Sequence, residues 1–171
     1  FKGVYDGANL TITGLTINKP YSNYQALFGY IRYASIKNVK LVNCNITGDR
    51  YIGGIVGYAS GSSSSKSNIE NCHVSGTIAA ITTDAEGHGG IVGSAYYATI
   101  TGCTVTGTVS TTVENKFYGG IVGYATYTTI TSCENAASIS GNGGDHGGIV
   151  GYLREDISRS EERRVGKECR S

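Results

Sequence analysis

The stretch IGGIVGYA at residues 52–59 decides the fold, because the chain repeats it. The other copies are HGGIVGSA at 88–95, YGGIVGYA at 118–125 and HGGIVGYL at 146–153, with a degenerate ALFGYI at 26–31. The copies recur with a period of about 30 residues, and the unit from Ile52 to His88 is the longest. Self-similarity at such a period is the signature of a protein built from stacked repeats.

A second motif keeps the same period. It reads LVNCNITG, IENCHVSG, ITGCTVTG and ITSCENAA, and its cysteines are Cys44, Cys72, Cys103 and Cys133. After each central cysteine, apolar or small residues alternate with polar ones, which is typical of a half-buried strand. The residue pairs just before the cysteines, such as Glu70-Asn71 and Thr101-Gly102, have the chemistry of corners.

A unit this short cannot bury its own apolar face, so it must stack on its neighbours. We therefore predict an all-β, right-handed parallel β-solenoid of about four to five coils, spaced about 4.8 Å apart. Each unit is expected to hold two or three short strands, and GGIVGY reads as one strand covered on both sides. The excess of the longest unit is placed in a loop, GSSSSKS, at 61–67.

Stacking in register predicts columns of identical residues. A cysteine column is expected from Cys44, Cys72, Cys103 and Cys133. A tyrosine column is expected from Tyr30, Tyr58, Tyr124 and Tyr152, interrupted by Ser94. Close coil contact is expected to require the repeat glycines, which are Gly53, Gly54, Gly57, Gly89, Gly90, Gly93, Gly119, Gly120, Gly123, Gly147, Gly148 and Gly151.

These four GGIVG copies resemble the GLUG-motif repeats of large secreted and cell-wall proteins of bacteria. The opening FKGVYDGANLTITGLTIN is similar to the strand-rich lead-in of such regions. The resemblance implies an extracellular β-solenoid segment of a modular protein, often an adhesin-like or protease-associated one, and carries over no catalytic residue. It gives a lead-in at residues 1–25, repeats at 26–152 and an unassigned stretch at 153–158. The residues Glu134-Asn135-Ala136 depart from the repeat pattern and predict a frayed last coil.

The last thirteen residues, RSEERRVGKECRS at 159–171, follow none of these rules. They resemble, codon by codon, the translation of a common short-read sequencing adapter. We therefore interpret them as a non-native tail and exclude them, together with Cys169, from functional reasoning. Because the chain opens at Phe1 without a signal-like segment, we expect it to be an internal piece of a longer protein.

Charge and composition argue against two classes of partner. Without the tail, nine basic and ten acidic residues remain. A nearly neutral body lacks the basic patch that nucleic-acid or anionic-membrane binding requires. No apolar stretch approaches the roughly 20 residues of a membrane-spanning helix.

The cysteines and histidines leave several readings open. The four repeat cysteines could be buried free thiols, disulfides or metal ligands, although they contain no CxxC motif. Stacked parallel strands point their Cβ atoms alongside each other, which disfavours a disulfide. His88 and His146 occupy matched positions and read as corner residues, because Ile52 and Tyr118 stand in their place elsewhere. His73 reads as a surface residue.

An enzyme is the serious alternative to a structural segment, since β-helix polysaccharide-active enzymes carry carboxylates on one outer face. The carboxylates between the cysteine strands and the next Gly-Gly are Asp49, Asp84, Glu86, Glu114 and Asp145. The stretch GNGGDHGG at 141–148 faintly resembles a calcium-binding nonapeptide. We expect no enzyme activity, no cofactor and no metal.

The predicted function is a stiff spacer or a repetitive adhesive face of an extracellular bacterial surface protein. A carbohydrate-binding module is the alternative, because tyrosines stack on sugar faces. The expected partners are host or bacterial glycans, surface proteins and neighbouring domains of the parent chain.

Overall fold

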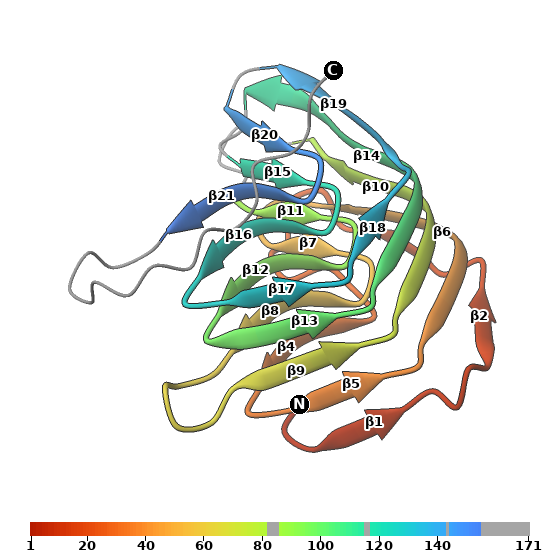
Figure 1. Cartoon of the computed structure of the whole chain (residues 1–171). Helices are drawn as coiled ribbons and strands as arrows, with labels where there is room; N and C mark the ends of the chain where they lie inside the picture. Colours follow the sequence, from red (N-terminus) through yellow and green to blue (C-terminus); the bar gives the residue numbers. More distant parts are fainter. Residues whose placement is uncertain (82–85, 115–116, 143, 155–171) are drawn as a thin grey trace.

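In a computed structural model, the chain winds into a four-sided solenoid of short parallel strands (Figure 1). The structure describes residues 1–81, 86–114, 117–142 and 144–154. The proposed adapter-like tail and Cys169 therefore lie outside the described residues, as does Asp84. No helix occurs in the described part of the chain. The prediction of an all-β parallel solenoid is confirmed, and its right-handed winding stays a prediction.

Each coil passes through four faces in turn, and one sheet covers each face. The first face holds β1 (Val4–Asp6), β5 (Ser35–Lys37), β9 (Ser67–Glu70), β13 (Ala98–Thr101) and β17 (Thr129–Thr131). The second holds β2 (Thr11–Thr13), β3 (Thr16–Asn18), β6 (Lys40–Gly48), β10 (His73–Ala80), β14 (Thr104–Glu114), β18 (Glu134–Asn135) and β19 (Ser138–Asn142). The third holds β7 (Ile52–Gly53), β11 (His88–Gly89), β15 (Phe117–Gly119) and β20 (Asp145–Gly147). The fourth holds β4 (Phe28–Arg32), β8 (Val56–Ser60), β12 (Val92–Tyr96), β16 (Val122–Thr126) and β21 (Val150–Arg154).

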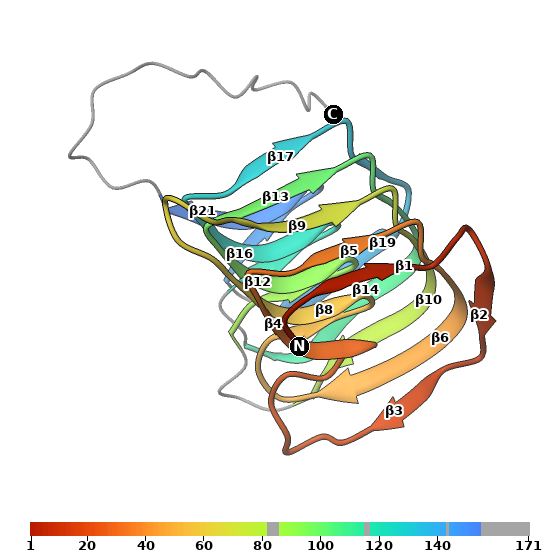
Figure 2. The ribbon, with the colours of Figure 1, turned by 90° about the horizontal axis from the view of Figure 1, so that it is seen from below.

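Strands of successive coils pair in parallel, so equivalent residues form columns. On the first face, Ile36 pairs with Ile69, Ile69 with Ile100, and Ile100 with Ile130. Figure 2 shows these strands as consecutive parallel arrows. The strands of the lead-in join the same stack, since β1 pairs with β5, and β2 and β3 pair with β6.

The GGIVG motif turns a corner instead of forming one strand. The third-face strand β7 ends at the first glycine of the motif, Gly53, and the fourth face starts at Val56, with Gly54 and Ile55 between them. Ile55 and Val56 are both fully buried because the chain bends between the two sheets. The expectation of a single strand covered on both sides is therefore wrong, and most coils hold four short strands.

The repeat glycines are required for close backbone contact. At eleven of the twelve predicted glycines, an added Cβ would lie less than 3.0 Å from a backbone atom. At Gly54, for example, it would lie 2.6 Å from the Gly90 carbonyl oxygen of the next coil. Gly148 differs, because nothing lies within 4 Å of the position of its Cβ. The predicted packing role is therefore wrong for Gly148, which has no further described coil beside it.

The cysteine column contains three of the four predicted members. Cys72, Cys103 and Cys133 each precede strand residues that pair with one another, from His73 through Thr104 to Glu134. Cys44 instead pairs with Gly76, and Val39 occupies the position below Cys72 because Lys40 pairs with His73. The prediction for Cys44 is wrong, because the turn that follows it contains more residues than separate Cys44 from Cys72. Gly76, and not Cys72, therefore lies opposite Cys44.

The extra residues enter the second coil at two places. Ile36 and its partner Ile69 are further apart in the sequence than Tyr30 and its partner Tyr58. The loop between β8 and β9, which contains the predicted serine-rich stretch, accounts for this increase and projects from the stack in Figure 1. The separation is larger still between the partners Ile52 and His88, so the connection between β10 and β11 holds the rest.

The corners before the cysteine motif use left-handed backbone. Asn71, Gly102 and Ser132 have φ of +50°, +64° and +53°, and Asn38 has +55° at the same corner of the previous coil. Asparagine and glycine adopt this region at low cost. The predicted corner at these residue pairs is confirmed.

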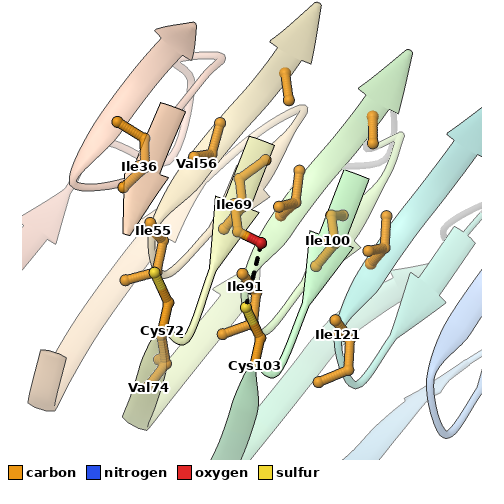
Figure 3. Packing of buried hydrophobic residues seen from close by; sticks show 14 of the residues in the cluster. Ile36, Ile55, Val56, Ile69, Cys72, Val74, Ile91, Ile100, Cys103 and Ile121 are labelled. Carbon is orange, nitrogen blue, oxygen red and sulfur yellow. Dashed lines mark hydrogen bonds between the residues drawn. The ribbon is translucent and has the colours of Figure 1, made fainter. Parts of the chain in front are cut away.

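The core is a set of aliphatic columns inside the four faces. Ile55, Ile91 and Ile121 are fully buried and follow one another through backbone hydrogen bonds of 3.1 Å and 3.0 Å. Figure 3 shows this column beside the thiols of Cys72 and Cys103. Each coil thus completes the core of its neighbours, as expected for a repeat that cannot bury its face alone.

Candidate functional site

The predicted tyrosine column lies on the fourth face in full register. Tyr30 pairs with Tyr58, Tyr58 with Ser94, Ser94 with Tyr124, and Tyr124 with Tyr152. The rings of Tyr30 and Tyr58 are 5.4 Å apart and 1° from parallel. Those of Tyr124 and Tyr152 are 5.6 Å apart and 7° from parallel. The column therefore consists of two stacked pairs separated by one serine.

A second row of aromatic side chains runs beside this column on the third face. Tyr51 and Phe117 each precede a residue of the column formed by Ile52, His88 and Tyr118, and Gly87 stands at the same place between them. The Tyr51 ring lies 5.3 Å from that of Tyr58, and the Phe117 ring 5.3 Å from that of Tyr124. Both rows thus lose their aromatic ring in the same coil.

The paired interruption leaves a groove of about 680 Å³. Tyr51 and Tyr58 bound it on one side, and Phe117, Tyr124 and Tyr152 on the other. Ser94 is buried and lies at the bottom. Three charged side chains, Glu86, Asp145 and Arg154, complete the lining. A volume of this size lies within the usual range of small-molecule sites, about 300–1,000 Å³.

The groove combines aromatic walls with a polar rim. The Tyr51 hydroxyl donates a hydrogen bond of 3.2 Å to Oε2 of Glu86. Burial, together with the Glu86 carboxylate, raises the pKa of Tyr51 to about 12, and burial also raises the pKa of Tyr58. Both phenols therefore stay protonated at neutral pH and can donate hydrogen bonds. Such a surface suits a ligand with apolar faces and hydroxyl groups at its edges.

Two of the predicted carboxylates, Glu86 and Asp145, meet in this groove. They belong to coils two steps apart, which corresponds to about 10 Å along the stack. The side chain of Glu114 lies outside the described residues, as does all of Asp84. Within the described ranges, no three His, Cys, Asp or Glu side chains gather closely enough to hold a metal ion.

The histidines do not share one environment. His88 is fully buried between Ile52 and Tyr118, so its expected place at an outer corner is wrong. Neither of its ring nitrogens has a hydrogen-bond partner among the described residues, and burial lowers its pKa to about 3. His146 is exposed and stacks on Tyr118 at 4.8 Å. His73 is half-buried, and its Nδ1 lies 2.8 Å from the Thr104 hydroxyl.

The four repeat cysteines are free thiols. Cys44, Cys72 and Cys103 are buried, whereas Cys133 is partly exposed. The Cys103 thiol lies 3.8 Å from the Ile69 carbonyl oxygen and 3.5 Å from that of Thr101. Cys44, Cys72 and Cys103 therefore fill core positions.

Three of the nine residues that line the groove are absent from the sequence-based prediction. The tyrosine column includes Tyr58, Tyr124 and Tyr152, but not Tyr51, Phe117 or Arg154. The signal is nevertheless present, because the residue before each copy of the motif is Tyr51, Gly87, Phe117 or Asp145 in turn. This repeat position is aromatic in two units and is glycine in the unit that carries Ser94. The pattern therefore indicates that both aromatic rows are interrupted in the same coil.

The two best-formed repeats match a known family model. The GLUG motif is found at residues 48–79 and 84–110, which cover the second and third GGIVG coils and part of the groove. This chain carries GLUG repeats. The GLUG match agrees with the recognised GGIVG core and ends before the GGIVG copies of the fourth and fifth coils. Among curated proteins, none matches the chain.

A solved structure shares the fold of these GLUG repeats. It is a "putative immunoglobulin A1 protease" from Bacteroides ovatus, with a TM-score of 0.55 and 18% sequence identity. The alignment covers 92% of this chain and 64% of that protein, so this chain spans less than two thirds of that protein's length. At this identity the likeness concerns the fold alone. In the part of this chain that the structure describes, no helix could span a membrane.

Proposed function

We propose that this chain is a structural and adhesive segment of a large extracellular bacterial surface protein. In this role it acts as a stiff spacer and presents a repetitive binding face. The observation that carries the proposal is the uninterrupted parallel pairing of equivalent residues through successive coils, such as Ile36, Ile69, Ile100 and Ile130. The GLUG motifs at residues 48–79 and 84–110 support it, because the resemblance to GLUG repeats implies a secreted or cell-wall protein.

Stiffness follows from the way the coils are joined. In the described part of the chain, successive coils are joined through four sheets and a shared aliphatic core. Bending such a stack would open backbone hydrogen bonds and core contacts together. A segment of this kind holds neighbouring domains of the parent chain at a fixed separation.

The aromatic groove favours a second function, carbohydrate binding. Stacked tyrosines beside carboxylate, guanidinium and hydroxyl groups suit a sugar, which has apolar ring faces and polar edges. The proposed partners are therefore host or bacterial glycans, with protein surfaces as the alternative. Nucleic acid and direct membrane insertion form no part of the proposal.

We propose that the chain is not an enzyme. The alternative is polysaccharide hydrolysis by Glu86 and Asp145, since inverting enzymes place their carboxyl groups roughly 6.5–9.5 Å apart. Release of reducing ends from neutral and acidic polysaccharides would support that alternative, provided that Glu86→Gln and Asp145→Asn each abolish it. Equal release by the wild type and both variants would exclude these carboxylates.

Surface display is tested on intact cells of the bacterium that encodes the parent protein. Antibodies raised against the folded chain should label unpermeabilised cells, and brief protease treatment of those cells should remove the label. Labelling that requires permeabilisation would contradict the proposal. A cytoplasmic protein of the same bacterium provides the control for intact envelopes.

A further inference from the structure

We propose that the gap at Ser94 and Gly87 is a binding slot for one pyranose ring of a neutral glycan, held between Tyr58 and Tyr124. This inference rests on the proposed function as a binding face and names the ligand class and the place. The slot lies in the one coil of the described part of the chain in which both aromatic rows are interrupted.

The spacing of the ladder fits one inserted ring. Neighbouring rings in the column are 5.4 Å apart at Tyr30 and Tyr58 and 5.6 Å at Tyr124 and Tyr152. Across the serine coil, Tyr58 and Tyr124 are two coil steps apart, which is about 9.6 Å. One ring placed midway would lie about 4.8 Å from each tyrosine, close to the spacing of the ladder itself.

The double interruption is what makes the gap a cavity. If only Ser94 replaced a tyrosine, a ring at the Gly87 position could fill the space from the side. Gly87 has no side chain and a φ of +70°, and a Cβ added to it would lie 3.4 Å from Cβ of Tyr124. An added side chain would therefore enter the slot. The two small residues together leave it open.

The polar groups around the slot favour a sugar over an aromatic side chain of a protein. Tyr51, Glu86, Asp145 and Arg154 offer both donors and acceptors around the slot, and Ser94 adds a hydroxyl group at its bottom. A pyranose carries hydroxyl groups that can form further hydrogen bonds with these side chains, whereas a phenyl ring forms none. Two carboxylates against one guanidinium also disfavour acidic sugars.

The test uses the full chain and ligand-observed NMR with isothermal titration calorimetry. The probes are neutral tetrasaccharides of glucose, galactose, mannose and N-acetylglucosamine, together with tetragalacturonate and N-acetyl-tyrosinamide. We expect at least one neutral tetrasaccharide to bind, with saturation transfer strongest at the protons of a single ring. Tetragalacturonate and N-acetyl-tyrosinamide should bind more weakly.

Two variants locate the site. Ser94→Tyr completes the ladder and should weaken binding about tenfold or more, while circular dichroism and urea unfolding confirm the fold. Tyr124→Leu removes one wall and gives the same test if the first variant fails to fold. The matched control is Tyr97→Ala, because Tyr97 stacks on Tyr127 at 4.5 Å in an aromatic cluster away from the groove.

Three results would overturn the slot. These are the absence of binding by every neutral probe, undiminished binding by a folded Ser94→Tyr protein, and preferential binding of N-acetyl-tyrosinamide at this place, which would indicate a protein partner. None of them bears on surface display, which the antibody experiment tests separately. Conversely, sugar binding by a chain that is not displayed would contradict only the proposed location.

Discussion

Gly76 lies opposite Cys44 in the neighbouring coil, and a Cβ added to it would clash with the backbone of Cys44. The pairing of β6 with β10 shifts register between Val74 and Gly76, and Gly76 has a φ of +131° at this shift. Glycine is thus required twice, for its backbone conformation and for the close approach of two coils. The shift takes up part of the mismatch between coils of unequal length.

Replacing Gly76 by alanine should therefore destabilise the solenoid. We expect a loss of about 2 kcal/mol or more, because strained backbone alone costs about 1–3 kcal/mol and the added Cβ must also displace Cys44. Urea unfolding followed by circular dichroism measures the change. Gly148→Ala is the matched control, since nothing lies within 4 Å of that Cβ position. Equal stability of the two variants would show that the register shift is not held by Gly76.

The inward isoleucine column should carry much of the stability of each coil. Ile100 is fully buried and contacts both neighbouring coils through its pairing with Ile69 and Ile130. Ile100→Ala should cost about 2–5 kcal/mol through lost burial and the cavity left behind. Thr99→Ala on the same strand should change the stability by no more than about 0.5 kcal/mol, as expected for a surface site. Urea unfolding measures both changes in the free energy of unfolding, provided that its dependence on urea concentration is unchanged. Similar losses of stability in the two variants would contradict the assignment of this column to the core.

The sequence predicts the columns wherever the coils keep equal length, and fails where they do not. Ile69, Ile100 and Ile130 align in the sequence as they do in space, because the third and fourth coils have similar lengths on the first face. Cys44 aligns with Cys72 in the sequence but pairs with Gly76, because insertions are invisible until strand partners are known. A sequence period is measured in residues, whereas equivalent strands pair once per turn of the solenoid, whatever the number of residues in that turn.

The groove escapes prediction from the sequence for a related reason. Ser94 marks a break in one column, but the matching loss at Gly87 lies on another face of the coil. The corner formed by GGIVG brings these positions together, and a straight strand at GGIVG would keep them apart. The burial of His88 is missed for the same reason. It becomes evident only from its strand partners, the apolar Ile52 and the fully buried Tyr118.

The core thiols should resist alkylation until the protein unfolds. Thiolates are the reactive species, and burial raises the pKa of Cys44. At Cys103, the Cys133 thiol lowers the pKa, but the Cys72 thiol and burial raise it, with a net pKa of about 12. Iodoacetamide at pH 8 should therefore leave Cys44 and Cys103 unmodified in the native protein and modify both in urea. Mass spectrometry of peptides assigns each site separately.

This experiment also separates free thiols from disulfides. Free thiols react in urea without a reductant, whereas a disulfide would stay protected until it is reduced. Rapid labelling of Cys103 in the native state would contradict its core position. Protection that persists in urea and disappears with reductant would instead support the disulfide alternative.

His88 should make the stability of the solenoid fall with decreasing pH. Its folded-state pKa is lowered to about 3 by burial, while the unfolded chain binds the proton below about pH 6.5. Between these values the unfolded state holds more protons than the folded state, so the free energy of unfolding decreases as the pH falls. The slope for this group is about 1.4 kcal/mol per pH unit, and the loss ends near pH 3. Above about pH 6.5 the effect is absent.

The variant His88→Ile isolates this contribution, because Ile52 occupies the same column and fits the core. The variant should be at least as stable as the wild type at pH 7, since it removes a ring whose nitrogens lack hydrogen-bond partners among the described residues. Its advantage should widen as the pH falls from about 6.5 to about 4, while carboxylates and the other histidines affect both proteins equally. Urea unfolding at half-unit pH intervals measures the difference. A constant difference across this range would mean that His88 is protonated in the folded chain and is not buried as a neutral ring.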